Sequence, residues 1–599
     1  MIATDNKASI KGGEFLIKDT DASQVFIPEE FTEEQQMIAA TCREFLAKEI
    51  WPRLDEIDRA ESPALMSSLM DKAGELGLLG TSVPEEYGGF GMNFNTSMLV
   101  AEATGAGHSF SVALSAHTGI GTLPIVYYGN DEQKGKYLPK LASGEWKAAY
   151  CLTEPDSGSD ANSGKTKAVL SEDGKFYSIT GQKMWITNGG FADLFIVFAK
   201  IEDDKNLSAF IVEKSYEGIT MNEPEHKLGI KGSDTRQVFF TDTKVPVENL
   251  LSERGNGFKI AVNILNIGRI KLGVAVVGGA KQAINSSIQY SNERKQFGIN
   301  ISRFGAIKHK LGEMAIKVYA SESASYRAGQ NIDDAIEDLK EGGMADAPAK
   351  LKALEQFAIE CAMMKVHGSE VLDYVVDEGV QVYGGMGYSA DAPMERSYRD
   401  ARINRIFEGT NEINRMLVVD MLLKRAMKGE LDLMTPAMAI AKEIMSIPDF
   451  NNDEEETLFG AEKKVLKNLK KSVLMIAGAA VQKFMGKLSH EQEILMNIAD
   501  MAIEVYVAES VLLRVEKLIG IKGEGALTLQ KDMAITYLHE AVEKISNAGR
   551  SAITSFAEGD ELRVMLMGLK RFTKIEPINL KDARRRVADA MIEENKYIF

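Results

Sequence analysis

The spacing of apolar residues gives the first part of the chain a helical period. The segment PEEFTEEQQMIAATCREFLAKEI (28–50) begins with a proline and acids, and apolar residues then recur every three to four positions. This pattern is typical of an amphipathic helix. The apolar positions are Met37, Ile38, Cys42, Phe45 and Leu46. Helical spacing continues with glycine-rich breaks, so we predict a helical N-terminal domain over 29–146, preceded by an N-terminal extension over 1–28.

From about residue 147 the period changes to two. The runs KFYSITGQKMWITNG, DLFIVFAK, LSAFIVEK and QVFFTDTKVP are rich in β-branched and aromatic residues, and polar turns separate them. Such runs are typical of short strands in a compact all-β unit. We therefore predict an inserted β-barrel domain over 147–254.

Long amphipathic helices return with GNGFKIAVNILNIGRIKL (255–272), and we predict a helical domain over 255–427. The stretch 428–460 mixes helix breakers with an acidic run, which indicates a linker with one short helix. The remainder, 461–599, is again helical in pattern. The expected fold class is therefore mainly α with an inserted β domain and an additional C-terminal helical domain.

The first helix of that last domain, AEKKVLKNLKKSVLMIAGAAVQKF, is basic at its start and apolar along one side. Such a helix can lie on an anionic membrane surface, or it can pack its apolar side into a core with the lysines in water. We favour the core. Its lysines are Lys463, Lys464, Lys467, Lys470 and Lys471, and its apolar side carries Val465, Leu469, Val473, Ile476, Ala480 and Phe484.

Composition narrows the function classes. The 599 residues are 45% hydrophobic and 26% charged, as in globular proteins of several domains. The net charge of −17 argues against a general nucleic-acid binder, which would be basic. The three cysteines stand apart from one another, and the histidines lack metal-ligand spacing, so we expect neither a disulfide framework nor a metal site.

The start of the chain shows no targeting segment. The first thirty residues contain acids and no apolar core of the signal-peptide type, and no run of eighteen apolar residues occurs anywhere. We therefore expect a cytoplasmic protein without a membrane span. No GxGxxG lies between a strand and a helix, and no GxxxxGK[ST] occurs, so a nucleotide-fold oxidoreductase or a P-loop enzyme has no support.

Five short segments carry candidate chemistry, and each also has an ordinary structural interpretation. A Ser/Gly turn can bind an anion but is usually a surface turn, and a strand tryptophan can face a planar ligand but is usually a core residue. Paired glycines allow close approach of a ligand or a sharp turn between helices. A glutamate between an apolar pair and a glycine can be a base of raised pKa or an ordinary helix-end residue. The segments are AYCLTEPDSGSDA (149–161), KMWITNGG (183–190), NERKQFG (292–298), QVYGGMGY (381–388) and RIFEGTNEINR (405–415).

In this order and spacing, the five segments resemble the acyl-CoA dehydrogenase family over residues 30–425. The helical tail after 425 is similar to that of the very-long-chain acyl-CoA dehydrogenases. The resemblance implies a helical N-domain, a β middle domain and a four-helix-bundle C-domain, which bind FAD non-covalently.

The resemblance also implies the cofactor residues. Thr153 and Ser159 would reach the polar edge of the flavin, and Thr187 would bond to its N5. Arg294 and Phe297 of one subunit would reach the cofactor across a dimer interface. The implied set is Tyr150, Leu152, Thr153, Gly158, Ser159, Trp185, Ile186, Thr187, Arg294, Phe297, Gln381, Gly384, Gly385, Thr410, Asn411 and Glu412.

Glu408 matches the catalytic base of the family, which removes the α-proton of an acyl-CoA while the β-hydride passes to the flavin. Its apolar neighbours Ile406 and Phe407 can help raise its pKa. Some relatives place the base on the helix containing NILNIGRIKLG, where this chain has Gly268. Glycine cannot act as a base, so Glu408 is the single candidate.

Further matches imply how the substrate binds. Ser159, Asn266, Arg269 and Gly409 would contact the substrate, with Arg269 at its CoA portion. On the helix matching SFSVALSAHTG, Val112 and Ala116 take the places where medium-chain relatives close the acyl pocket with bulky polar side chains. We therefore expect a deep pocket for long chains.

The leading interpretation is a homodimeric dehydrogenase of long-chain acyl-CoA that passes electrons to an electron-transfer flavoprotein. An acyl-CoA oxidase, which reduces oxygen directly, is an alternative. A third, different in class, is a flavin-binding scaffold relative without catalysis, although a scaffold has no need of a base. Peripheral membrane contact through the C-terminal domain is a further hypothesis, and no nucleic-acid partner is expected.

Overall fold

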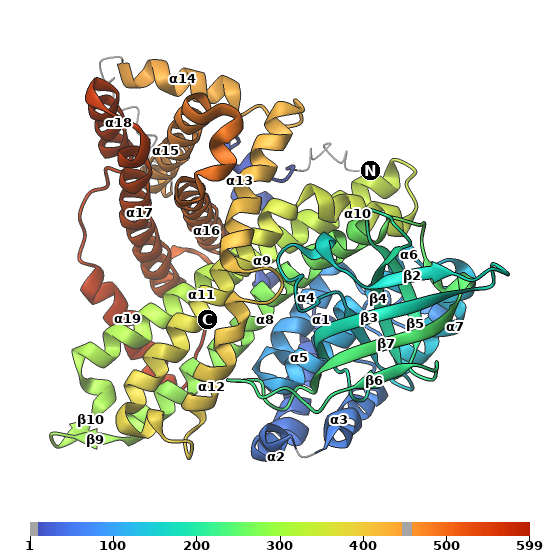
Figure 1. Ribbon diagram of the computed structural model, residues 1–599. Coiled ribbons are helices and arrows are strands. Elements are labelled where there is room, and N and C mark those ends of the chain that lie inside the picture. The colour runs from blue at the N-terminus through green and yellow to red at the C-terminus, as the bar shows by residue number, and fades with distance from the viewer. Residues whose placement is uncertain (1–9, 61, 446–457) are drawn as a thin grey trace, which may run out of the picture.

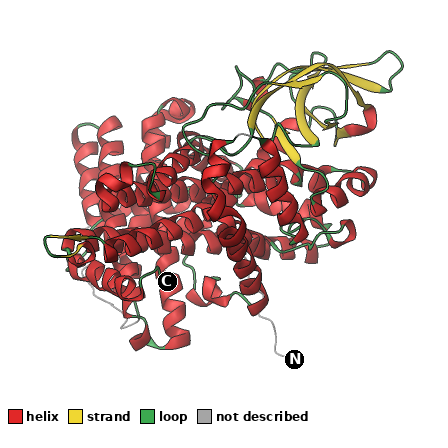
Figure 2. Cartoon of the chain, turned by 90° about the horizontal axis from the view of Figure 1, so that it is seen from below, coloured by secondary structure: helices red, strands yellow, loops and turns green. Residues whose placement is uncertain are grey.

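The computed structural model describes residues 10–60, 62–445 and 458–599. Two largely helical regions flank a central set of long helices, and a β domain projects from one side (Figures 1 and 2). Parts of the predicted extension (1–9) and of the predicted linker (446–457) lie outside the described residues.

The N-terminal region is helical up to residue 143. Thr32 begins α1 with a side-chain cap on the Gln35 N–H, as the TEEQ pattern indicates. Met37 is 64% exposed, because it lies off the stripe that buries Cys42 and Phe45 in this helix. The helices are α1 (Glu33–Phe45), α2 (Leu54–Arg59), α3 (Pro63–Glu75), α4 (Phe94–Thr104), α5 (Ser109–Ser115), α6 (Leu123–Tyr128) and α7 (Asp131–Ser143).

The β domain follows directly. The paired order is β6-β7-β3-β2-β4-β5-β8, with β1 beside β4, so the sheet is mixed and curls around a core of its own. That core includes Ile179, Phe195, Phe210 and Phe240. The strands are β1 (Ala148–Cys151), β2 (Lys167–Leu170), β3 (Phe176–Thr187), β4 (Leu194–Ile201), β5 (Ser208–Glu213), β6 (Ile219–Met221), β7 (Thr235–Pro246) and β8 (Leu250–Leu251).

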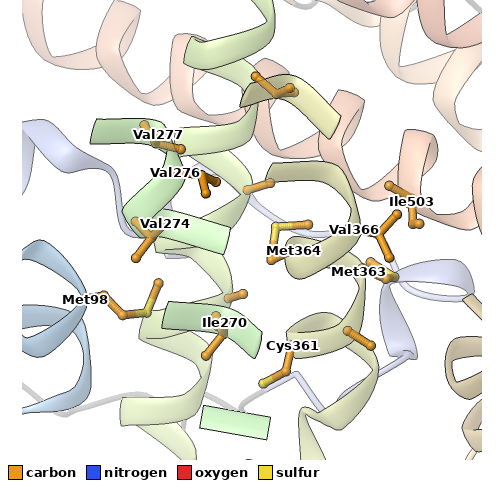
Figure 3. Close-up of a cluster of buried hydrophobic side chains, with 14 of the residues drawn as sticks. Met98, Ile270, Val274, Val276, Val277, Cys361, Met363, Met364, Val366 and Ile503 are labelled. Atoms are coloured by element: carbon orange, nitrogen blue, oxygen red, sulfur yellow. The ribbon is translucent and has the colours of Figure 1, made fainter. Parts of the chain in front are cut away.

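Four helices and a small hairpin form the centre of the molecule. Figure 3 shows α8 and α11 in contact through small and medium apolar side chains, with Met98 of α4 on one side. A Cβ at Gly368 would lie 2.4 Å from the Gly273 carbonyl oxygen, so only glycine allows α8 and α11 to approach this closely. The elements are α8 (Gly257–Glu293), β9 (Lys295–Gln296), β10 (Ile299–Asn300), α9 (Gly305–Glu341), α10 (Asp346–Gln356) and α11 (Ala358–Tyr383).

Two further helices, α12 and α13, lead from this centre to the tail, and six more make up the described part of the tail. The tail packs against α9, α11 and α13, and its last helix returns to α9 (Figure 1). The helices are α12 (Pro393–Ala401), α13 (Asn411–Met427), α14 (Met434–Met445), α15 (Gly460–Phe484), α16 (Gln492–Lys522), α17 (Thr528–Phe556), α18 (Gly559–Phe572) and α19 (Leu580–Glu594).

Buried charges fasten the tail to the rest of the chain. Arg514 donates to Glu29 at 2.8 Å and to Glu322 at 2.7 Å, and Arg327 donates to Glu509 at 2.9 Å. The described part of the N-terminal extension takes part as well. Phe15 packs edge-on against Tyr506 of α16, with ring centroids 4.9 Å apart, so the extension is part of the same docking surface.

The basic helix α15 packs its apolar side into the core. Leu469, Val473, Ile476 and Ala480 are buried, as the favoured interpretation predicted. Several of its lysines pair with acids of the same chain, namely Lys463 with Glu516, Lys467 with Asp19, Lys470 with Glu509 and Lys471 with Glu443.

Two helical segments meet length and hydropathy criteria for crossing a membrane. They are Ser109–Tyr128 and Gly257–Glu293, and 67% and 72% of their most apolar windows are buried inside the fold. Core helices of this length satisfy the same criteria, so these segments are explained by their burial.

Candidate active site

Glu408 lies in a strained loop between a 3₁₀ turn (Arg402–Arg405) and α13. Its φ is +58°, and that of Gly409 is +80°, so two consecutive residues are left-handed. The second is glycine, which adopts this conformation without cost, but a glutamate there is uncommon and is found where surrounding contacts enforce it.

Three side chains from three helices hold this loop by its carbonyls. Arg269 of α8 donates from Nε to the Glu408 carbonyl at 3.3 Å. Lys365 of α11 donates to the Gly409 carbonyl at 2.7 Å, and Asn414 of α13 donates to the same oxygen at 2.8 Å. Because these donors come from packed helices, they fix the backbone from which the Glu408 side chain projects.

The Glu408 carboxylate has an oxygen without a hydrogen-bond partner. Oε2 of Glu408 is buried and accepts no hydrogen bond within the described residues. Burial raises the pKa of Glu408 to about 7, although the positive charges of Arg269 and Lys365 act in the opposite direction. A carboxyl group with this pKa can accept a proton near neutral pH, as a general base must.

The apolar surroundings of Glu408 differ in part from expectation. Phe407 lines the cavity in front of the base, as predicted. Ile406 is 47% exposed and does not line it, so it contributes little to the burial of the carboxylate; the expectation that Ile406 helps was wrong. Ile406 lies in the turn between the 3₁₀ turn (Arg402–Arg405) and the left-handed residues Glu408 and Gly409, and its side chain points toward solvent there.

Gly268 lies directly opposite the Glu408 carboxylate. A Cβ built on Gly268 would be 2.5 Å from Oε2 of Glu408, which is closer than real Cβ contacts come. The glycine at position 268 therefore leaves room for the Glu408 side chain.

A large cavity begins at this pair and continues between α4, α5 and α8. Its volume is about 460 Å³. Along α8 its lining extends from Ile264 past Gly268 to Ser286, and Val112 and Ala116 of the neighbouring segment also line it, as predicted. Most of the wall is aliphatic, so the cavity suits a long apolar ligand.

The tryptophan strand reaches the same cavity. Thr187 lines it, and Trp185 is 60% exposed at a β-bulge with φ of +55°. Trp185 is therefore not a core residue. Ile186, by contrast, points into the core of the β domain and is 2% exposed, so only its backbone can face a ligand.

The segment after β1 is partly buried and partly on the surface. Tyr150 lies near Glu408. Burial holds the pKa of Tyr150 well above its usual range, and the negative charge of Glu408 acts in the same direction. Among the described residues, the Tyr150 hydroxyl is buried without a hydrogen-bond partner. Leu152 is buried and Thr153 half-buried, whereas Gly158 and Ser159 are exposed on the loop. A buried ion pair, Lys183 with Glu154 at 2.7 Å, fixes the base of that loop.

The residues expected to act from another subunit lie elsewhere. The β9–β10 hairpin, with Arg294 and the 94% exposed Phe297, lies on the side of the molecule away from the β domain (Figures 1 and 2). Gln381, Gly384 and Gly385 are exposed too, and a Cβ on either glycine would meet no atom within 4 Å. A single chain thus does not bring this group to Thr187.

The remaining predicted residues cluster around the loop that contains Glu408 and Gly409 (the base loop). Asn266 accepts from Arg269 at 2.9 Å, and both are buried, so Arg269 is engaged beside Glu408 while its predicted CoA contact stays a prediction. Thr410 caps α13 through Ile413 N–H. Asn411 is buried and bonded to Lys365, and Glu412 is exposed at the helix start.

Three polar groups of the site escaped the sequence interpretation. Lys365 holds the base loop, Lys271 lines the cavity, and His108 bonds Asp400 at 2.9 Å in its wall. A signal did exist for the lysines, since each interrupts an apolar helical run, in CAMMKVHG and in NIGRIKLGV. No comparable signal marks the histidine, whose partner is distant in sequence.

Comparison with known proteins covers nearly the whole chain. Family models described as the acyl-CoA dehydrogenase N-terminal, middle and C-terminal domains match residues 32–145, 149–243 and 255–423, and a second C-terminal-domain model matches 468–571. A probable acyl-CoA dehydrogenase of Bacillus subtilis is 45% identical over 98% of both chains.

Two further relatives bear on the tail and the site. A crystal structure of an acyl-CoA dehydrogenase from Bacillus anthracis, complexed with FAD, is 46% identical and covers 99% of this chain and 100% of its own, with a TM-score of 0.95. The mitochondrial very long-chain specific acyl-CoA dehydrogenase of Rattus norvegicus is 42% identical over 63% of this chain and 57% of its own length. The chain therefore belongs to the acyl-CoA dehydrogenase family, the oxidoreductases that act on CH–CH groups.

Proposed function

We propose that the protein is an FAD-dependent dehydrogenase of long-chain acyl-CoA thioesters, which it converts to trans-2-enoyl-CoA. One observation carries the proposal. A buried, unpartnered carboxylate, Oε2 of Glu408, faces a glycine at the end of a long aliphatic cavity. An unpaired carboxylate with a pKa of about 7 is costly to bury and is explained by a proton that it must take from a substrate.

The residues present fit FAD. Trp185 offers an exposed aromatic face at the β-bulge, and Thr187 presents a hydroxyl at the cavity beside it. The orphaned hydroxyl of Tyr150 lies nearby. Trp185 and Thr187 would hold the ring system, with the loop ending in Ser159 at its polar edge. FAD would supply the hydride acceptor that oxidation of a CH–CH bond requires.

Glu408 would remove the α-proton of the thioester. Its loop is held by Arg269, Lys365 and Asn414, so the carboxylate keeps its position while charge develops. The Glu408 backbone N–H would donate to the thioester oxygen and stabilise enolate character. The aliphatic wall excludes water, which keeps the carboxylate a stronger base than it would be in solution.

The length of the cavity supports a long-chain substrate. Its lining on α8 reaches from Gly268, beside the base, to Ser286, which at 1.5 Å per residue is about 27 Å of helix. Val112 and Ala116 leave this path open. A short acyl chain would leave most of this space unfilled.

We propose further that the enzyme acts as a homodimer and passes its electrons to an electron-transfer flavoprotein. The exposed hairpin with Arg294 and Phe297 supports the dimer, because Phe297 is 94% exposed and, among the described residues, its one ring contact is with Phe304. Membrane docking by the start of α15 has less support, since four of its lysines already pair with acids of this chain.

A spectroscopic experiment tests the proposal. The holoenzyme is mixed anaerobically with palmitoyl-CoA, and flavin absorbance is followed. We expect bleaching, followed by recovery on addition of an electron-transfer flavoprotein. Absorbance that stays constant with acyl-CoA thioesters of every length would reject a dehydrogenase and favour the scaffold alternative. Rapid recovery in oxygen alone would favour the oxidase.

A further inference from the structure

Lys271 is a half-buried cation in the wall of the cavity, and it has no counter-charge among the described residues. It lies on α8 and lines the cavity one helical turn beyond Gly268. Within the described ranges, no carboxylate pairs with it, and its one hydrogen bond is a long contact of 3.5 Å to Ser82 Oγ. Burial alone accounts for the lowering of its pKa to about 8.

Several other polar groups of the cavity are already satisfied, whereas Oε2 of Glu408 is kept for the reacting end of the substrate. Four hydroxyls on its helices donate to carbonyls of their own helix or turn, and thus present mainly carbon to the cavity. They belong to Ser97, Thr104, Ser111 and Thr118. His108 and Asp400 bond each other. Among the described residues that line the cavity, Lys271 is the one lysine or arginine, and it lies in a mostly aliphatic wall.

Placing the Lys271 ammonium group in this aliphatic wall costs free energy, and a hydrocarbon ligand would increase that cost. A saturated chain displaces water from the cavity and offers no acceptor, so it would leave the charge unpaired. An oxygen on the chain at the same depth would accept from Nζ in a charge-assisted hydrogen bond. The position one turn from Gly268 places that oxygen on the carbons shortly after the reacting pair.

We propose that Lys271 is a specificity-determining residue that adapts the cavity to acyl-CoA thioesters bearing an acceptor oxygen, as hydroxyl or carboxylate, a few carbons beyond the reacting bond. The proposal rests on the proposed dehydrogenase function and deepens it by naming a substrate class. Lys271 takes no part in proton or hydride transfer; it contacts only the chain.

The test compares three substrates on the holoenzyme. Palmitoyl-CoA has no acceptor, hexadecanoyl-CoA hydroxylated at the δ-carbon places a hydroxyl beside Lys271, and adipyl-CoA places a carboxylate there. In Lys271→Met, we expect kcat/KM for at least one oxygenated substrate, relative to palmitoyl-CoA, to fall about tenfold or more. The loss should appear in KM rather than in kcat, because the contact is made equally before and during reaction.

Two variants separate recognition from a merely structural role. Lys271→Arg keeps the charge and should retain the preference, whereas Leu272→Met, a volume-conserving change at the next position in the same wall, should leave the ratio of the substrates as in the wild type. Binding of the matching S-alkyl-CoA thioethers, measured by calorimetry, should show the same order without turnover.

The outcomes discriminate clearly. A response with the hydroxylated chain alone, or with adipyl-CoA alone, identifies the source of the oxygen and supports the proposal. Substrate ratios unchanged within twofold in Lys271→Met, or equal losses on all three substrates, would overturn it. If Lys271→Met does not fold, Lys271→Gln replaces it. A wild type that does not bleach with palmitoyl-CoA or the other two thioesters would instead refute the proposed function.

Discussion

Charged groups are buried in opposite ways at the base loop and at the tail interface, where α16 of the tail contacts α9 and the N-terminal extension. At the tail interface, Arg514 has two carboxylate partners and stacks over the ring of Tyr319 at 4.0 Å. At the base loop, the cations Arg269 and Lys365 bond to backbone carbonyls, and Oε2 of Glu408 remains free. The first arrangement joins two parts of the chain; the second leaves one acceptor for a substrate.

The difference lies in where the donors are aimed. A salt bridge to Glu408 would lower its pKa toward that of an ordinary carboxylate and make it a weak base. By placing the donors on the carbonyls of 408 and 409, the fold gains a rigid loop while the carboxylate keeps a pKa of about 7. Rigidity and basicity are thus obtained together.

The largest expected effect is that of Glu408→Gln. The amide cannot accept the α-proton, so flavin reduction by palmitoyl-CoA should slow by about a thousandfold or more. Cofactor content should be unchanged, because the change removes one proton acceptor without altering the shape of the loop. Stopped-flow absorbance measures the rate, and a variant that still turns over at the wild-type rate would show that another residue is the base.

At the tail, Arg514→Met removes a buried cation that pairs with the buried Glu322 and with Glu29. Glu29 then loses this ion pair and Glu322 keeps Lys281 alone, so the free energy of unfolding should fall by about 3 kcal/mol. Urea unfolding followed by circular dichroism measures the change. Arg563→Met is the matched control, since Arg563 pairs with Asp560 in full exposure and should cost less than about 1 kcal/mol. Equal losses in both variants would contradict the contrast between the two regions.

Gly268→Ala sharpens the geometry of the base. The added Cβ would stand 2.5 Å from Oε2, so the carboxylate must move, and a displacement of this order is expected to reduce kcat about a hundredfold. Stability should change little, because the neighbouring atom is the end of a side chain. Wild-type kcat in this variant would mean that the base acts from a different rotamer.

The pH dependence should follow the unpaired carboxylate. Glu408 acts only when deprotonated, so kcat/KM should decline as the pH falls through about 7, by about tenfold per unit below it. The wild type is measured between pH 5 and 9. A profile flat down to about pH 5 would indicate a carboxylate with an ordinary pKa.

Much of the architecture follows from local pattern. The change of period near residue 147 predicts the β domain, and the TEEQ and GTNE segments predict helix starts that the structure contains. The candidate role of Glu408 follows from the family resemblance together with Gly268, because the motif alone also fits an ordinary helix end. Patterns of this kind are local, and residues a few positions apart are enough to encode them.

The rest depends on contacts between distant residues. Glu408 and Gly268 are 140 positions apart, and nothing local shows that they face each other. Ile406 and Ile186 have apolar neighbours in sequence but opposite environments, one exposed and one in the β core. The docking of Phe15 onto Tyr506 joins the N-terminal extension to α16 of the tail, so no window of sequence contains it.

The exposed hairpin has a thermodynamic consequence. If Arg294 and Phe297 of one subunit complete the cofactor site of its partner, then subunit association and FAD binding share one free energy of coupling. Dilution below the dimer dissociation constant should release the cofactor, and excess FAD should hold the dimer together at concentrations where the apoprotein separates. The yellow colour of the protein would then report its own state of assembly.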